Sequence, residues 1–510
     1  MERRYLKNLL KWKDDPYRKP LLVWGARQVG KTYLIRDIFA ERCYKNRSVY
    51  IDCRTDREFC NYCEEHRSAE EILNYISLRK GMDLDRNTLL IFDEAQECPT
   101  IITAMKYFCQ DHREIPIIVT GSMVRIRIKR KKRGPYDKGF LFPVGKINEI
   151  TITPLSFDEY LYNRNKVMFD TVVEHYRNRE PLENAIHESI LKVFYEYLLI
   201  GGMPESISSF LETKSFNRSR EILKELYDNY LADMELYQAS PESIIRTRAI
   251  FSNIYSMLNK ESKNFSPSLI EKGARTRDML SPLDWLTEAH IVNICRRIEG
   301  HVTLPLTSEG NIFRLYLCDI GMFSYQSPID PTSFLTDDGR NMLAGVFYET
   351  FAAQELRSRG LDLFYWQGKR GSEFEFVLGK RGTPIPVDVK KGRGSLNSLK
   401  AYRGINSLDY AVKVSRNNYG FDEDQRILTL PFYELFLFAD EMADDSIPED
   451  IAEAGSHHQR RVQTDYRNVC AVETYQYQSG CPVDPVPEAD HQEHHYAEQE
   501  HHRQMEGQHG

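Results

Sequence analysis

The sequence predicts an α/β protein in which a parallel sheet is followed by helices and then by a second α/β domain. Short apolar runs alternate with amphipathic stretches over the first 155 residues, as a three-layer α/β fold requires. These runs are nearly continuous in apolar residues, which is typical of parallel strands covered on both faces. Strand-like alternation is missing from residues 155–240 and is clearest at residues 372–378.

The composition is that of an ordinary globular protein, with 41% hydrophobic residues and a net charge of −7. A mildly acidic chain binds nucleic acid only through a local basic patch. No apolar run approaches the roughly 18 residues of a membrane-spanning helix. The N-terminus lacks the apolar segment of a secretory signal. We therefore expect a cytoplasmic protein of about three domains with reduced cysteines and no membrane partner.

The first 155 residues contain four apolar runs that we expect to be strands, each ending in a turn residue or an acid. The expected strands are 20–24, 48–52, 88–92 and 115–120. Helical spacing of apolar residues predicts helices over 33–40 and 70–80.

A phosphate-binding pattern, G-x-x-x-x-G-K-[ST], lies between the first expected strand and the first expected helix. Glycines let consecutive backbone N–H groups point at phosphate oxygens, and the helix N-terminus adds positive potential. Lys31 would reach the β- and γ-phosphates and the Thr32 hydroxyl would hold Mg²⁺, so the predicted cofactors are ATP and Mg²⁺. The predicted nucleotide-binding residues are Gly25, Ala26, Arg27, Gln28, Val29, Gly30, Lys31 and Thr32.

An acidic pair, Asp93 and Glu94, ends the apolar run 88–92 and should reach the same edge of the sheet. Asp93 would hold Mg²⁺ together with Thr32, and Glu94 would orient or deprotonate the attacking water. Ser122 follows the next strand, where it would either touch the γ-phosphate or the water, or simply form a turn. The predicted catalytic residues are therefore Glu94, Lys31 and Ser122.

These motifs resemble those of AAA-type P-loop ATPases. The similarity is closer to a family of bacterial and archaeal ATPases with an uncharacterised C-terminal domain, DUF4143. It rests on GARQVGKT, LLIFDEAQ, IIVTGSM, ITPLSFDEY at 152–160 and Gly-Gly-x-Pro-Glu at 201–205, and it spans about residues 1–440. The resemblance implies an AAA-like P-loop NTPase core over residues 1–155.

A dense basic run covers residues 125–133 and is unusual for the family that the chain resembles. It would track a nucleic-acid backbone, or supply an arginine finger to a neighbouring protomer in an oligomer, or form a solvated surface loop. DNA is therefore one predicted partner, and the alternatives stay open.

The middle of the chain should form a helical lid over 156–240 and a winged helix over 245–306. Gly201 and Gly202 interrupt the helical pattern and indicate a hinge or a tight approach. In the winged helix we expect a helix over 265–273, a recognition region beginning at 274, and wing strands over 291–297 and 302–306. Arg275 and Arg277 would then contact DNA phosphates, although the same fold also docks protein clients.

The segment 310–438 should form a third α/β domain. We expect a helix over 341–357 and strands over 361–366, 372–378 and 385–390. Strand alternation places Asp388 and Lys390 on one face, with Glu375 on the neighbouring strand and Glu349 on the helix.

This pattern of acids and lysine resembles the PD-(D/E)XK nucleases. The resemblance implies that the two strand carboxylates hold Mg²⁺, that Lys390 polarises the attacking water, and that Glu349 helps to position the metal. Relatives more often carry Asp at position 375 and Glu at position 388, which changes the reach of both carboxylates. A scaffold without nuclease activity is the alternative, because charged outer faces are common in half-exposed sheets.

Two further features are secondary. Cys53, Cys60, Cys63 and His66 lie close in sequence, but a single C-x-x-C pair is half of a zinc pattern, so we expect ordinary thiols on a helix. Residues 439–510 are poor in apolar residues and rich in His, Glu and Gln, so we expect disorder. Their histidines would either sequester metal or belong to an unselected extension.

The sequence as a whole predicts an ATP-dependent switch that couples an AAA-type ATPase to winged-helix and nuclease-like modules. One alternative is a DNA-processing enzyme with a Mg²⁺-dependent nuclease in its C-terminal domain. The other is an ATP-gated regulator that binds DNA or a protein partner without catalysis.

Overall fold

A computed structural model describes residues 1–122, 142–237, 240–308, 310–330, 336, 345–368, 371–380, 382–390 and 397–444. The basic run 125–133 and the predicted tail beyond residue 444 lie outside these residues. Within this part of the chain, no helix is both long and apolar enough to cross a bilayer.

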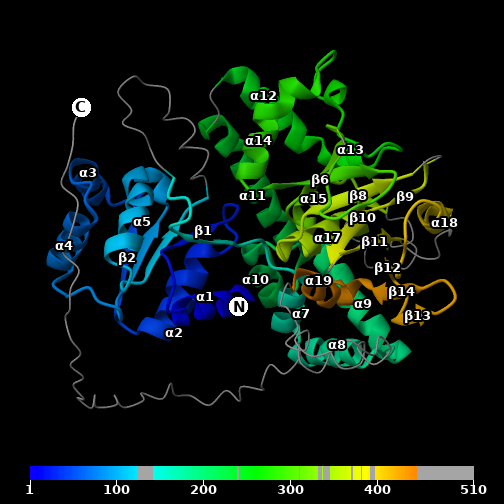
Figure 1. The fold of residues 1–510 in the computed structure, drawn as a ribbon, viewed down its shortest axis with the longest axis horizontal. Helices are drawn as coiled ribbons and strands as arrows, with labels where there is room; N and C mark the ends of the chain where they lie inside the picture. Colours follow the sequence, from blue (N-terminus) through cyan, green and yellow to red (C-terminus); the bar gives the residue numbers. More distant parts are fainter. Residues whose placement is uncertain are drawn as a thin grey trace, which may run out of the picture. The chain divides into compact units, whose positions relative to one another are not determined.

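The N-terminal part of the chain forms a five-stranded parallel sheet of order β2-β3-β4-β1-β5 (Figure 1). The four expected strands are present, and the half-exposed edge strand β5 was not predicted. The strands are β1 (Leu21–Trp24), β2 (Ser48–Asp52), β3 (Leu89–Asp93), β4 (Ile117–Thr120) and β5 (Asn148–Thr151). Because β4 lies between β1 and β3, the carboxyl ends of these three strands meet at one edge of the sheet.

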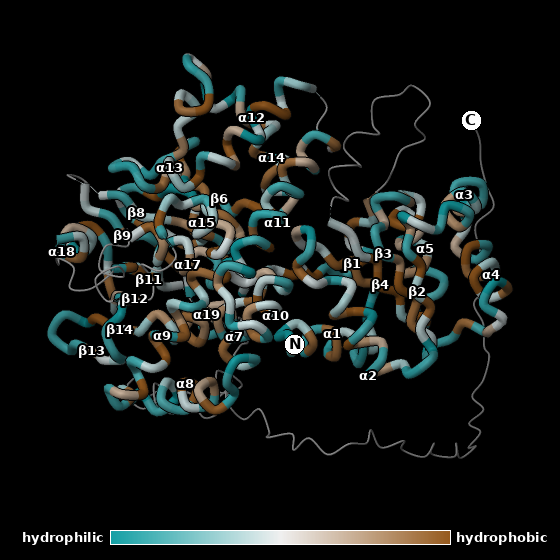
Figure 2. The backbone as a smooth tube through the Cα atoms, turned by 180° about the vertical axis from the view of Figure 1, so that it is seen from behind, coloured by the Kyte–Doolittle hydropathy of each residue, from teal (hydrophilic) through white to brown (hydrophobic). Residues whose placement is uncertain are grey.

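Both faces of this sheet are buried, and hydrophobic residues concentrate along its strands (Figure 2). Alternate residues of β1, β3 and β4 face two separate cores, one shared with α1 and η1 and the other with α3, α4 and α5. The helical elements are α1 (Tyr5–Asp14), η1 (Tyr33–Ala40), α2 (Glu41–Tyr44), α3 (Arg57–Glu65), α4 (Ala69–Lys80), η2 (Ala95–Glu97) and α5 (Pro99–Asp111). The helix expected over 33–40 has π geometry and continues directly into α2.

The next part is helical, as the sequence indicates. It contains α7 (Phe157–Arg164), α8 (Lys166–Asn178), α9 (Asn184–Ile200), α10 (Pro204–Thr213), α11 (Phe216–Tyr237), α12 (Pro241–Ser252), α13 (Ile254–Leu258), η3 (Pro267–Leu269), η4 (Thr276–Met279) and α14 (Leu280–Glu288). Gly201 and Gly202 mark a tight approach. A Cβ on Gly202 would lie 2.0 Å from the Leu155 carbonyl oxygen, and one on Gly201 would lie 2.4 Å from an Asp319 carboxylate oxygen.

The expected wing does not form as predicted. Residues 302–306 are not a strand, and the segment 265–273 contains only the short turn η3. The expected strand at 291–297 is present as β6 (Val292–Glu299), but it pairs antiparallel with β7 (Phe313–Leu317) and parallel with β8 (Leu363–Gln367). The pairing partners come from residues beyond 306, so β6 belongs to a sheet that the local pattern alone could not reveal.

The C-terminal part contains two sheets, of order β7-β6-β8-β9 and β10-β11-β12-β14-β13. The remaining elements are α15 (Ile320–Gln326), α17 (Val346–Ser358), β9 (Glu373–Phe374), β10 (Phe376–Lys380), β11 (Thr383–Val389), α18 (Asn397–Arg403), β12 (Ala411–Ser415), β13 (Gly420–Asp422), β14 (Ile427–Pro431), η7 (Phe432–Glu434) and α19 (Leu435–Ala443). Two expectations need correction. The strand expected over 372–378 is broken at Glu375, and residues 439–443, expected to be disordered, complete α19.

Candidate nucleotide-binding site

The backbone of the loop 25–32 adopts conformations that favour glycine. Gly25 has φ +141° and Gly30 has φ +86°, and a Cβ on Gly25 would lie 2.2 Å from the Ile152 carbonyl oxygen. Only glycine therefore fits at position 25. Gln28 also has a positive φ, +62°. These turns bring the loop from the end of β1 to the start of the helix that follows, the position expected of a phosphate loop.

Lys31 is folded back over this loop. Its Nζ donates hydrogen bonds to the carbonyl oxygens of Ala26 and Gly25, at 2.7 and 3.1 Å. The residue is only 8% exposed. Burial lowers the pKa of Lys31 to about 8, although Glu94 and Asp93 oppose this shift. The ammonium is therefore held near the loop by neutral carbonyl groups and not by a carboxylate.

Asp93, at the end of β3, is the centre of a hydrogen-bond network. The Thr32 hydroxyl donates to its Oδ2 at 2.6 Å, and the Tyr50 hydroxyl donates to the same oxygen at 2.9 Å. Its Oδ1 accepts hydrogen bonds from the Glu94 backbone N–H at 2.9 Å and from the Thr120 hydroxyl. The sequence did not single out Tyr50 or Thr120, whose position depends on the pairing of β2 and β4 with β3.

Glu94 follows Asp93 in the left-handed backbone region, with φ +51°. The Gln96 amide donates to its Oε2, and Arg54 forms an ion pair with the same oxygen at 3.3 Å. Ser122 is buried just after β4, at the sheet edge where β1 and β3 also end. The structure thus brings the predicted residues to one edge, and it adds Arg54 and Gln96 as groups that position Glu94.

Side chains from outside the loop hold its backbone in place. Arg3 donates a 2.8 Å hydrogen bond to the Val29 carbonyl oxygen. The Tyr230 hydroxyl donates at 2.9 Å to the Arg27 carbonyl oxygen, and the Arg27 guanidinium pairs with Asp233. Because Tyr230 and Asp233 both lie on α11, one long helix of the middle region contacts the loop directly.

Arg3 also belongs to a second set of buried charges. Its side chain donates to Glu159 Oε1 at 2.9 Å and to the Thr153 carbonyl oxygen at 2.7 Å. The backbone N–H of the next residue, Arg4, donates to the same Glu159 oxygen at 2.8 Å. The Arg4 guanidinium then donates at 3.0 Å to the carbonyl oxygen of Ser358, the last residue of α17.

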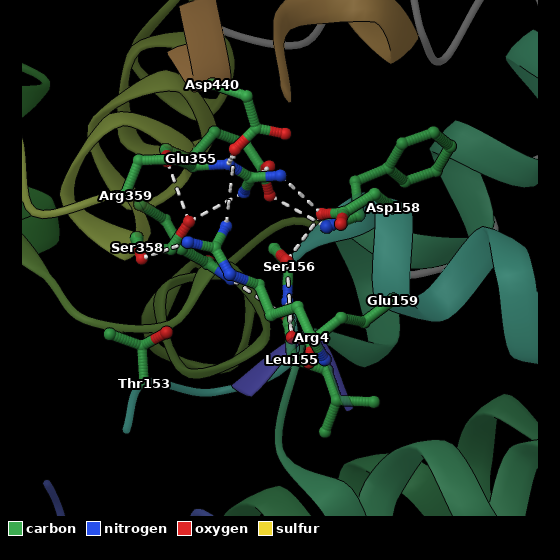
Figure 3. Close-up of polar contacts among 12 residues, drawn as sticks. Arg4, Thr153, Leu155, Ser156, Asp158, Glu159, Glu355, Ser358, Arg359 and Asp440 are labelled. Atoms are coloured by element: carbon green, nitrogen blue, oxygen red, sulfur yellow. Dashed lines mark hydrogen bonds and ion pairs between the residues drawn. The ribbon is translucent and has the colours of Figure 1, made fainter. Parts of the chain in front are cut away.

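Arg359, directly after α17, is the centre of this buried cluster (Figure 3). Its guanidinium contacts Asp158 at 2.7 Å, Glu355 at 2.9 Å and Asp440 at 3.1 Å, and its side chain is 1% exposed. Burial raises the pKa of Glu355 to about 7, with Arg359 opposing. The cluster joins three separate helices, α7, α17 and α19, and Arg4 connects it to the residues that hold the phosphate loop.

The predicted acid and lysine residues of the C-terminal part also come together. Lys390 Nζ lies 2.6 Å from Glu375 Oε1 and 3.1 Å from Asp388 Oδ1, and the Val389 N–H donates to Glu375 Oε2 at 3.0 Å. Burial and the neighbouring Glu375 raise the pKa of Asp388 to about 7. Burial also raises the pKa of Glu349, and Glu375 adds to this shift.

Two cations at this cluster were missed by sequence reasoning. Lys263, from the loop after α13, pairs with Glu349 at 2.6 Å and with Glu373 at 3.5 Å. Arg314, on β7, contacts Glu373 at 2.6 Å. Neither belongs to a local motif. Among the residues that the structure describes, no group of three or more histidine, cysteine, aspartate or glutamate side chains is arranged so that it could hold a metal ion.

Comparisons with known protein families divide the chain into three successive domains. The family described as an AAA domain matches residues 17–161. Two domains of unknown function follow, DUF8612 over residues 191–333 and DUF4143 over residues 344–433. The chain therefore contains an AAA-type P-loop domain followed by these two uncharacterised domains. No curated protein matches the chain.

Several solved structures are similar to part of the chain. A Walker-type ATPase of Pyrococcus abyssi is 17% identical, with 64% of this chain and 95% of that chain covered and a TM-score of 0.37. DnaA of Aquifex aeolicus bound to AMPPCP is 17% identical, covering 56% and 84% of the two chains with a TM-score of 0.25. The replication initiator DnaA bound to AMPPCP and single-stranded DNA is 15% identical, covering 55% and 85%, with a TM-score of 0.24.

Proposed function

We propose that this chain binds ATP and Mg²⁺ at the loop 25–32 and hydrolyses ATP as a switch that acts on its C-terminal domains. The observation that carries the proposal is the 2.6 Å hydrogen bond between Thr32 and Asp93. It joins the phosphate-loop hydroxyl to the acid at the end of β3, and these are the two groups that an ATPase of this kind needs beside Mg²⁺.

The residues at this edge fit a magnesium nucleotide. Thr32 and Asp93 would hold the ion, because hydroxyl and carboxylate oxygens are ligands that Mg²⁺ prefers. When bound, Mg²⁺ neutralises charge that develops on the phosphates. Lys31 would exchange its two carbonyl contacts for a phosphate oxygen. Glu94, held by Arg54 and Gln96, would orient the attacking water and accept its proton. Ser122 would contact the γ-phosphate or that water.

The ATPase proposal is tested by phosphate release from the full chain. Lys31→Ala removes the ammonium that would stabilise charge in the transition state, and we expect turnover to fall about 10²–10³-fold. Lys80→Ala, at an exposed position of α4, is the matched control and should leave turnover unchanged. Equal turnover in the Lys31→Ala variant and the wild type would refute the assignment.

The buried charges support the proposal that the ATPase acts as a switch. The path begins at Val29 in the loop and passes through Arg3, Glu159 and Arg4 to the end of α17. The same helix carries Glu349 in the C-terminal cluster. We infer that a change in the loop on nucleotide binding alters how firmly α17 is held.

Hydrogen exchange with and without Mg²⁺ and a non-hydrolysable ATP analogue tests this coupling. We expect nucleotide to change the exchange of the amides of α17 in the wild type. The change should be lost in Arg3→Met, which removes the contact with Val29, and kept in Lys7→Met, an exposed position of α1. Identical exchange of α17 with and without nucleotide in the wild type would exclude the switch while leaving the ATPase intact.

A Mg²⁺-dependent nuclease in the C-terminal part is the second candidate. The observation in its favour is that Glu349, Glu375, Asp388 and Lys390 come together from a helix and a hairpin. For metal to bind, Lys263 would have to leave Glu349, because its ammonium now occupies that carboxylate. Cleavage of plasmid and linear DNA that requires Mg²⁺ and is lost in Asp388→Ala would establish the activity. No cleavage by a chain with active ATPase would exclude it.

A regulator that binds DNA or a protein client without catalysis is tested separately. Salt-dependent DNA binding that disappears when residues 127–133 lose their charge would support the DNA-binding form. A nucleotide-dependent change in molecular size would reveal an oligomer.

A further inference from the structure

Arg27, in the phosphate loop, is held by an acid from a distant part of the chain. Its guanidinium pairs with Asp233 on α11, 206 residues later in the sequence. The Asp233 side chain is 4% exposed, whereas that of Arg27 is 33% exposed. The pair therefore joins a buried carboxylate to a cation that is still partly open to solvent.

The backbone at Arg27 is fixed independently of this pair. The Tyr230 hydroxyl, one turn before Asp233 on α11, donates to the Arg27 carbonyl oxygen at 2.9 Å. Helix α11 therefore holds the loop by a neutral contact to its backbone and by a charged contact to a side chain. Rotation of the Arg27 side chain would release the charged contact while the loop keeps its shape.

Arg27 lies among the groups that would contact the phosphates. The carbonyl oxygen of Ala26, the residue before it, accepts the 2.7 Å hydrogen bond from Lys31. Burial is the main cause of the lowered pKa of Lys31, and the charge of Arg27 adds to it. Because Lys31 would contact the β- and γ-phosphates, a guanidinium beside it lies within reach of the terminal phosphate.

Asp233 has little else to compensate its charge. Its Oδ2 is buried and accepts no hydrogen bond from the residues that the structure describes. Burial raises the pKa of Asp233, although the charges of Arg27 and Arg54 oppose this shift. A carboxyl group in this position takes up a proton more readily once its cation leaves, so the buried charge need not stay uncompensated. The pair can therefore open at a moderate cost.

We propose that Asp233 makes the nucleotide site distinguish ATP from ADP, an inference that rests on the proposed ATP site. A terminal phosphate carries a charge of about −1.5 to −2 and three acceptor oxygens. It therefore draws the Arg27 guanidinium away from the singly charged carboxylate. ADP has no γ-phosphate and leaves the pair closed. Asp233 is thus a positioning residue that sets where Arg27 points without touching the nucleotide.

The γ-phosphate would in this way act on the middle region of the chain. Helix α11 packs against α9, α10, α12 and α15. With Arg27 on the phosphate, α11 keeps the contact of Tyr230 with the loop but loses the charged one. The part of α11 around Asp233 is then held less firmly with ATP than with ADP.

Calorimetric affinities of the full chain for a non-hydrolysable ATP analogue and for ADP, each with Mg²⁺, test the proposal. Asp233→Asn keeps the shape of the side chain but removes the competing charge. Analogue affinity should therefore rise about fivefold or more, and ADP affinity should change less than about twofold. Arg27→Met should weaken analogue binding about tenfold or more, and in that background Asp233→Asn should have no further effect. Asp228→Asn, which removes an exposed pair with Lys224 on the same helix, is the matched control and should behave as the wild type.

The outcomes separate this inference from the proposed function. A folded wild type that binds neither nucleotide refutes the ATP site and this inference with it. If the wild type binds both, and Asp233→Asn shifts the two affinities equally or not at all, the role of Asp233 is refuted and the ATP site stands. The same conclusion follows if Asp233→Asn acts as strongly in the Arg27→Met background as in the wild type.

Hydrogen exchange of the wild type gives an answer even if the variants fold poorly. With saturating nucleotide, the amides of residues 230–236 should exchange faster in the presence of the ATP analogue than in the presence of ADP. Equal exchange with the two nucleotides would overturn the proposal.

Discussion

The nucleotide site and the C-terminal cluster both combine acids with a lysine, but they use the lysine differently. Lys31 contacts only backbone carbonyl oxygens at 2.7 and 3.1 Å, so its charge is not neutralised by a hydrogen-bonded acid. Lys390 and Lys263 each contact a carboxylate at 2.6 Å. A cation held by carbonyls can move to a phosphate at little electrostatic cost, whereas breaking a buried ion pair leaves a charge uncompensated. The first arrangement suits ligand binding, and the second suits a stable scaffold.

The largest effect expected at the nucleotide site comes from Glu94→Gln. The amide keeps the shape of the side chain but cannot accept a proton, so turnover should fall about 10²–10⁴-fold while ATP affinity stays within a few-fold. Steady-state turnover and calorimetric affinity check this together, with Glu70→Gln on the exposed face of α4 as control. A parallel loss of affinity and turnover would show that Glu94 supports binding and not chemistry.

Arg359→Met tests the cluster of charges around Arg359, which lies between the phosphate loop and the C-terminal part of the chain. It leaves Asp158 and Glu355 without their cation, so we expect a loss of about 3–5 kcal/mol in unfolding free energy. Arg357→Met removes an exposed ion pair near the end of α17 and should cost less than about 1 kcal/mol. Urea unfolding of both variants makes the comparison. Equal losses would mean that the cluster does not hold α17 in place.

The C-terminal cluster predicts a stability that depends on pH. The pKa of Asp388 is about 7 in the folded chain and 3.8 as the ordinary value, so the folded state keeps a proton that the unfolded state loses. The stability that protonated Asp388 gives the folded state is fully present below pH 3.8, and it is lost as the pH rises through 7. The side chain of the Asp388→Asn variant cannot ionise. Between pH 5 and pH 8 the free energy of unfolding of this variant should therefore rise by about 2 kcal/mol relative to that of the wild type.

Denaturant midpoints at several pH values measure this difference. A constant difference between Asp388→Asn and the wild type across the range would contradict the shifted pKa. The same series is then repeated with Mg²⁺. If ionised carboxylates of this cluster bind the ion, the wild type should no longer be less stable above pH 7 than at lower pH.

The smallest effect concerns the pH dependence of nucleotide affinity. Burial lowers the pKa of Lys31 to about 8, and phosphate binds its charged form. Affinity should therefore be constant below pH 8 and fall by up to about tenfold per pH unit above it. Titrations in buffers of different ionisation enthalpy should also show proton uptake above pH 8. An affinity that stays level through pH 9.5 would show that Lys31 does not pair with the phosphates.

The sequence predicted best what depends on contiguous residues. The phosphate loop, the strands of the first sheet and the acids after β3 follow from local patterns, and strand alternation correctly placed Asp388 beside Lys390. It could not predict contacts between distant segments. Lys263, Arg314 and Tyr50 reach their sites only through strand pairing or loop packing. The prediction of a wing over 291–306 was wrong for the same reason, because β6 pairs with β7 and β8, which come later in the chain.

Whether this chain binds ATP at the loop 25–32 can be measured by calorimetric titration of the full chain with ATP in the presence of Mg²⁺. We expect saturable binding of one nucleotide per chain, lost in Lys31→Ala and retained in Lys80→Ala. Folded wild-type protein that releases no heat of binding at any ATP concentration up to millimolar, at two temperatures, would contradict it.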